Sequence, residues 1–140
     1  ITSLVTTIFI YISYEYLGYA NLKFSIIFFL IIFFYSFYAV KDSESEFKEK
    51  DPRQIVIDEV LGQSMPLILI LYLKQINQIS IHIEFYYIVS FFAFRFFDIL
   101  KPFPVSYFDK NFKNSFGIIM DDIMAGFYTM LVIYLISLKF

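Results

Sequence analysis

The stretch DPRQIVIDEVLGQSMPLILILYL, residues 51–73, joins a helix start, two adjacent acids and a long apolar run. Asp51 suits the N-cap, Pro52 the first helical position and Gln54 the third, which is a capping-box arrangement. The stretch is therefore predicted to form one helix. Pro66 lies inside this helix and is expected to kink it.

Acids interrupt two further apolar stretches of the chain. The five acids are Asp58 and Glu59 in the first stretch, Asp98 in FRFFDILKP (94–102), and Asp121 and Asp122 in GIIMDDIMAG (117–126). A carboxylate within a membrane segment costs roughly 2.5–3.5 kcal/mol on insertion scales, so such residues are usually functional. A shared cation-binding site would explain all five.

The composition is that of a membrane protein. Of the 140 residues, 59% are hydrophobic and 23% aromatic, more apolar surface than one soluble core of this size readily hides. The absence of cysteine excludes disulfides, cysteine metal sites and thiol nucleophiles. A net charge of −2 predicts no nucleic-acid partner.

The hydrophobic pattern predicts an all-α fold, a polytopic membrane bundle of about five helices within a single domain, residues 1–140. The predicted helices span residues 1–17, 24–40, 52–73, 85–100 and 117–138. The fourth should stop at Lys101-Pro102-Phe103-Pro104, because proline cannot continue a helix. The chain begins at Ile1 inside an apolar run, and an N-terminal part of the protein is expected to be missing.

The basic residues of the connections predict the orientation in the membrane. Seven lie in the connections on one side, Lys41, Lys48, Lys50, Arg53, Lys101, Lys110 and Lys113, and three on the other, Lys23, Lys74 and Lys139. The positive-inside rule places the first group in the cytoplasm. All three acidic stretches then lie at similar depth, at the cytoplasmic ends of helices three to five.

Residue spacing suggests which side chains meet. Arg95 and Asp98 are three apart and share a helix face, with Lys101 three residues further on. The two bases are candidate clamps for a phosphate group.

Two glycines follow acids by one helical turn. Gly62 comes four residues after Asp58, and Gly126 four residues after Asp122. A glycine at that position lets a neighbouring helix or a ligand approach closely. Clustered oxygen ligands, with neither cysteine nor a suitable histidine, favour a hard cation such as Mg²⁺.

These motifs resemble a known family. DPRQIVIDEVLGQ (51–63), FFAFRFFDILKPFPVSYFD (91–109) and GIIMDDIMAG (117–126) are similar to the signature stretches of the phosphatidylglycerophosphatase A family. The resemblance implies a Mg²⁺-dependent lipid phosphatase of the bacterial inner membrane, with its site facing the cytoplasm. Its implied reaction removes the terminal phosphate of phosphatidylglycerophosphate to give phosphatidylglycerol.

The resemblance also implies roles for the motif residues. The acids of the motifs, which would hold one or two Mg²⁺ ions and carry the catalysis, are Asp58, Glu59, Asp98, Asp121 and Asp122. Arg95 and Lys101 would bind the substrate phosphate. Two mechanisms stay open: attack by a water whose proton goes to a carboxylate such as Glu59, or an aspartyl-phosphate intermediate.

Other functions explain less of the sequence. A small ion or proton transporter subunit could use intramembrane carboxylates, but its acids would be expected near the bilayer midplane. A structural membrane subunit explains none of the acids. The single histidine, His82, lies in the connection on the other side and is expected to be a surface residue. Oligomeric state is left open.

Overall fold

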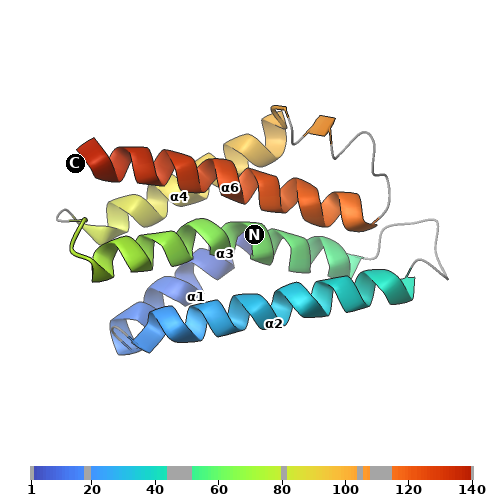
Figure 1. Cartoon of the computed structure of the whole chain (residues 1–140), viewed down its shortest axis with the longest axis horizontal. Coiled ribbons are helices and arrows are strands. Elements are labelled where there is room, and N and C mark those ends of the chain that lie inside the picture. The colour runs from blue at the N-terminus through green and yellow to red at the C-terminus, as the bar shows by residue number, and fades with distance from the viewer. Residues whose placement is uncertain are drawn as a thin grey trace.

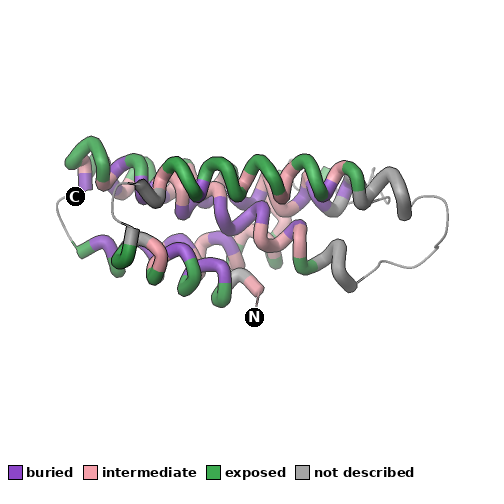
Figure 2. The backbone as a smooth tube through the Cα atoms, turned by 90° about the horizontal axis from the view of Figure 1, so that it is seen from below, coloured by how far each residue is buried: buried purple, intermediate pink, exposed green. Residues whose placement is uncertain are grey.

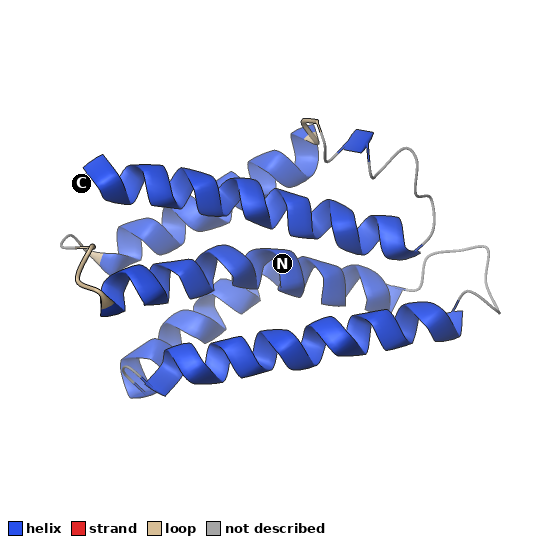
Figure 3. Cartoon of the chain, in the orientation of Figure 1, coloured by secondary structure: helices blue, strands red, loops and turns tan. Residues whose placement is uncertain are grey.

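The computed structural model describes residues 2–17, 20–43, 52–79, 82–103, 106–107 and 115–139. These residues contain no strand (Figure 3). The five long helices are α1 (Thr2–Leu17), α2 (Ala20–Ser43), α3 (Pro52–Gln75), α4 (Ile83–Leu100) and α6 (Ser115–Lys139). The predicted all-α bundle of about five helices is confirmed.

Most helix ends lie close to the predicted positions. α4 stops at Leu100, and Lys101 follows in the left-handed conformation (φ 47°) with its N–H donating to the carbonyl of Phe97. α2 is longer than predicted, since it begins at Ala20 and ends at Ser43. The residues that extend it, 20–23 and 41–43, include neither glycine nor proline, so nothing breaks the helix there. The predicted N-cap Asp51 lies outside the described residues.

Helix α3 forms the centre of the bundle. It packs against each of the other four helices. Figure 1 shows α3 between α6 and α2, with α1 and α4 behind. Leu61, Leu67 and Ile70 of α3 are fully buried. Most of the middle of α3 is therefore enclosed by other helices, although Val56 and Tyr72 remain about half exposed.

The chain direction brings all three acidic stretches toward one end of the bundle. At the right of Figure 1, α2 and α4 end while α3 and α6 begin. Asp58 lies near the start of α3, Asp98 near the end of α4, and Asp121 near the start of α6. The three acidic stretches therefore lie near one another along the bundle.

The outer faces of the helices are apolar. On α2, Phe24, Ile27, Ile31, Phe34 and Tyr38 recur at helical spacing, and each is more than half exposed. Figure 2 shows exposed faces along the outside of the bundle and buried faces within it. Such a continuous apolar stripe is typical of a surface that meets lipid or another apolar partner. By length and composition, two of the described helices could cross a membrane, in the segments Val56–Gln75 and Ile119–Lys139.

Helices α3 and α6 approach each other closely at two glycines. A Cβ atom on Gly126 would collide with the carbonyl oxygen of Gly62, and one on Gly62 would lie 2.5 Å from the carbonyl oxygen of Asp122. Pro66 lacks an N–H, so it cannot bond the Gly62 carbonyl four residues earlier. That carbonyl therefore faces the backbone of Gly126, as in the Cα–H···O contacts of tightly packed helices. α3 continues through Pro66 as one helix.

Candidate functional site

The glycine contact places the acids of α3 and α6 side by side. Asp58 and Asp122 each lie one turn before the glycine of their own helix. Because Gly62 and Gly126 bring the two backbones together, the preceding turns of both helices are also adjacent. The close approach expected from the glycine spacing is present, and it is made by a neighbouring helix.

Three carboxylates form a compact cluster. Asp98 of α4 and Asp121 and Asp122 of α6 each offer an oxygen, and these oxygens lie within 4.8 Å of one another. The carboxyl group of Asp122 also interacts with that of Asp58 on α3. Four acids from three helices therefore converge in one place.

Asp58 is the most deeply buried of these acids. It is 2% exposed, and its Oδ2 atom accepts no hydrogen bond within the part of the chain that the structure describes. A buried carboxylate oxygen without a donor is costly unless a cation or a proton satisfies it. This oxygen, beside the carboxylate cluster, is the clearest structural sign of a cation site.

An arginine joins the cluster to the remaining acid. The Nη2 atom of Arg95 lies 2.5 Å from Oε1 of Glu59, and its Nη1 atom lies 3.5 Å from Oδ2 of Asp98. The guanidinium thus links α3 to α4 through both sides of its planar fork. The i,i+3 pairing of Arg95 with Asp98 was predicted from spacing; its contact with Glu59 was not.

A lysine closes the other side of the cluster. The Nζ atom of Lys101 lies 2.9 Å from Oδ2 of Asp121. The left-handed conformation of Lys101 ends α4 and turns the chain, while its side chain reaches α6. Arg95 and Lys101 are each about one-third exposed, so both cations border the cluster at its accessible edge.

All seven residues singled out in the sequence therefore meet at one place. Ion pairs join Glu59 to Arg95, Arg95 to Asp98, and Lys101 to Asp121. Asp122 lies in the cluster with Asp98 and Asp121, and it is near enough to Asp58 for the two carboxyl groups to interact electrostatically. The donor set consists of carboxylate oxygens and suits a hard cation such as Mg²⁺. The residues present fit that ion.

A second polar group beside the site was missed in the sequence. The side-chain amide of Gln63, one turn after Glu59, donates to the hydroxyl groups of Thr7 on α1 (3.2 Å) and Ser90 on α4 (3.3 Å). Gln63 is fully buried, and its Oε1 atom has no partner among the described residues. The position of Gln63, four residues after Glu59 in an apolar run, was the available signal. Hydroxyl partners on two distant helices could not be inferred from it.

His82 lies away from the acids. It precedes α4 at the end of that helix opposite Asp98, and its side chain is 90% exposed. The imidazole Nδ1 lies 3.9 Å from Glu84, a surface contact. The surface position expected for His82 is confirmed.

Comparison with known proteins agrees with these motifs. The chain is 50% identical to phosphatidylglycerophosphatase A of Haemophilus influenzae over 50 residues, which are 36% of this chain and 31% of that protein. It is 41% identical to phosphatidylglycerophosphatase A of Escherichia coli over 48 residues, 34% of this chain and 28% of that protein.

A third relative carries a different name. A Bacteroides thetaiotaomicron protein, provisionally named phosphatidylinositol-3-phosphatase, is 36% identical over 84 residues, 60% of this chain and 48% of its own length. The chain thus spans less than half the length of each of these curated relatives. No solved structure matches it. The family model for phosphatidylglycerophosphatase A matches residues 1–137, nearly the whole chain, which therefore belongs to the phosphatidylglycerophosphatase A family.

Proposed function

We propose that the protein is a lipid phosphatase that hydrolyses the terminal phosphomonoester of phosphatidylglycerophosphate to phosphatidylglycerol and inorganic phosphate. The observation that carries this proposal is the convergence of five acids with Arg95 and Lys101 at one end of the bundle. Carboxylates that can hold a hard cation, bordered by two bases, form a site for a phosphate group. Membership of the family supports the same reaction.

The carboxylate cluster is the proposed Mg²⁺ site. Asp98, Asp121 and Asp122 would supply ligands, and Asp58, whose Oδ2 atom has no hydrogen-bond partner among the described residues, is a further candidate. Bound there, Mg²⁺ would offset the negative charge of the carboxylates and of the phosphate, and so make attack at phosphorus easier.

Arg95 and Lys101 would bind the phosphate. A guanidinium carries five N–H donors, and the contacts to Glu59 and Asp98 leave others for phosphate oxygens. The two carboxylates also fix the plane of the guanidinium, which favours bidentate binding. The ammonium of Lys101, held by Asp121, would contribute a second positive charge.

Hydrolysis also needs a proton acceptor or a nucleophile. The bond between phosphorus and the glycerol oxygen breaks, water adds to phosphorus, and the released glycerol oxygen takes up a proton. Glu59 is bound to Arg95, which favours an orienting role for it. If Asp98, Asp121 and Asp122 alone hold the cation, the Oδ2 atom of Asp58 would instead accept the proton of water, or attack phosphorus in the aspartyl-phosphate alternative.

The proposed location is the bacterial inner membrane, with the site toward the cytoplasm. The apolar outer faces and the seven-to-three bias of basic residues support it. Single cysteines in place of Phe47, of His82, which is 90% exposed in the connection around Ile79, and of Phe108 would test it, because the chain has no native cysteine. The first and third, which lie outside the described residues, should label from the cytoplasm and the second from the other side. Labelling of all three from one side would contradict this topology.

Phosphate release in detergent micelles tests the reaction. We expect the purified full-length protein to release phosphate from phosphatidylglycerophosphate when Mg²⁺ is present. Adding a chelator should abolish this release. Micelles enclose no compartment, so transport cannot produce this signal, and a folded protein without activity would favour the transporter alternative. Phosphatidylinositol 3-phosphate belongs in the same assay, because the Bacteroides relative bears that name. If phosphate is released faster from phosphatidylinositol 3-phosphate than from phosphatidylglycerophosphate, the proposed substrate is wrong.

A further inference from the structure

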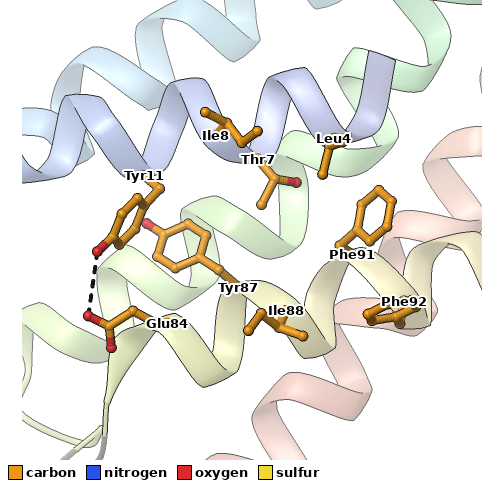
Figure 4. A pocket seen from close by; sticks show the side chains of 9 residues that line it. All are labelled: Leu4, Thr7, Ile8, Tyr11, Glu84, Tyr87, Ile88, Phe91 and Phe92. Carbon is orange, nitrogen blue, oxygen red and sulfur yellow. Dashed lines mark hydrogen bonds between the residues drawn. The ribbon is translucent and has the colours of Figure 1, made fainter. Parts of the chain in front are cut away.

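A groove of about 390 Å³ lies between α1 and α4 (Figure 4). Leu4 and Ile8 line its α1 wall, and Ile88 and Phe91 line its α4 wall. The lining is almost wholly apolar, and the volume falls in the range of roughly 300–1,000 Å³ that is typical of small-molecule pockets. Ile8 and Ile88 are about half exposed, so the described part of the chain leaves the groove accessible from outside.

The α4 wall of the groove leads to the candidate site. Glu84, Ile88, Phe91, Arg95 and Asp98 follow one another at intervals of four, three, four and three residues. This spacing places them on a single stripe of the helix. Phe91, at the end of the groove, is therefore one turn, about 6 Å along the axis, from Arg95.

The far end of the groove is polar and acidic. There the hydroxyl group of Tyr11 donates a long hydrogen bond of 3.5 Å to Glu84 (Figure 4). The negative charge of Glu84 opposes a phosphate at this end, whereas Arg95 attracts one at the other. An anionic lipid in the groove would therefore lie with its headgroup toward Arg95.

The length of the groove suits a lipid chain. From Glu84 to Phe91, α4 rises by about 10 Å. One leaflet of a bilayer has a hydrocarbon depth of about 15 Å, half of the ~30 Å core. The groove also opens among exposed apolar side chains, which in the proposed membrane location face acyl chains rather than water.

We propose that this groove binds one acyl chain of the lipid substrate and thereby directs the headgroup phosphate to Arg95. The inference rests on the proposed function. A chain that moves from bulk lipid into the groove gains packing contacts but no hydrophobic transfer energy. Binding in the groove therefore selects position and chain length more than it adds affinity.

Photo-crosslinking tests the position of the chain without requiring catalysis. The full-length protein is placed in phosphatidylethanolamine nanodiscs with a small fraction of phosphatidylglycerophosphate that carries a diazirine near the end of one acyl chain. We expect adducts to concentrate around Ile8 and Ile88, and excess unlabelled phosphatidylglycerophosphate to remove them more effectively than excess phosphatidylethanolamine. Adducts spread evenly over the outer faces, including Ile31 of α2, would overturn the proposal. The proposal would also be overturned if another segment of the full-length protein covers the groove and prevents lipid adducts there.

A pair of matched variants tests the effect on turnover. Ile88→Trp fills the groove, while Ile31→Trp makes the same change at a similarly exposed position on α2. The measured quantity is the ratio of kcat/KM for long-chain over short-chain phosphatidylglycerophosphate. Ile88→Trp should lower this ratio roughly 3- to 10-fold, a modest effect because only packing contacts are lost. Equal ratios in the two variants would contradict the groove as the chain site.

The two readouts separate this inference from the proposed function. Groove adducts in a protein that releases no phosphate would support the groove and contradict the phosphatase. Phosphate release with evenly spread adducts would support the phosphatase and contradict the groove.

Discussion

The two halves of α3 are both buried, but they pack in different ways. In the first half, Asp58 and Gln63 are buried polar residues, and Gly62 lets the backbone of α6 approach closely. In the second half, Leu67 and Ile70 fill the core with aliphatic side chains and belong to the larger apolar cluster of the bundle. The comparison suggests that the first half is built for chemistry and the second for stability. Substitutions in each half of α3, or in residues that pack against it, should therefore affect activity and stability to different extents.

The largest effect is expected where the acids converge on the first half of α3. Asp122→Asn keeps the side-chain shape but removes one charge from the carboxylate cluster. Phosphate release should fall more than ~100-fold, since even partners of metal ligands typically contribute 10- to 100-fold. The thermal unfolding temperature in detergent should not fall, because repulsion from Asp98 is relieved. His82→Ala, at the exposed far end of α4, should leave release unchanged. An active Asp122→Asn protein would remove this residue from the site.

The next effect concerns the contact that holds the first half of α3 against α6. Gly126→Ala adds a methyl group that collides with the Gly62 carbonyl, so the helices must move apart. Such overpacking costs about 1–3 kcal/mol, and it should also displace Asp122 from Asp58. Both the unfolding temperature and phosphate release should therefore drop. A protein with lowered stability but full activity would show that the glycine contact does not position the acids.

Substitution of Arg95 tests whether activity depends on the shape of the guanidinium or only on its positive charge. Arg95→Lys keeps the positive charge, but an ammonium cannot reach both Glu59 and Asp98 as the guanidinium fork does. We expect phosphate release to fall roughly 10- to 100-fold and to recover little relative to Arg95→Ala. Recovery close to the native rate would show that charge alone suffices.

The smallest effect on activity is expected in the second half of α3. Leu67→Ala leaves a cavity in the core, and comparable substitutions cost about 2–5 kcal/mol of unfolding free energy in soluble proteins. Well below the lowered unfolding temperature, phosphate release should stay close to that of the native protein. Leu135→Ala on the exposed face of α6 is the control and should change neither property. A large loss of activity in folded Leu67→Ala would break the distinction between the two halves.

Several features of the bundle could be predicted from the sequence because they depend on neighbours along the chain. The helical type of each segment follows from hydrophobic pattern and length, and the end of α4 follows from Pro102. The pairing of Arg95 with Asp98 follows from their spacing on one helix. The early start of α2 was not predicted, because polar residues permit a helix without requiring one.

The sequence by itself therefore determined the all-helical architecture. It also identified the five acids as functional candidates, because carboxylates are costly in a membrane segment unless they have a function. Tertiary structure alone decided that Arg95 binds Glu59, that Lys101 binds Asp121, and that Gln63 bonds to α1 and α4. It also decided that a groove lies beside α4. The physical reason is that periodicity along a chain determines which residues share a helix face. Which faces meet, and in what register, depends on how the helices pack against one another.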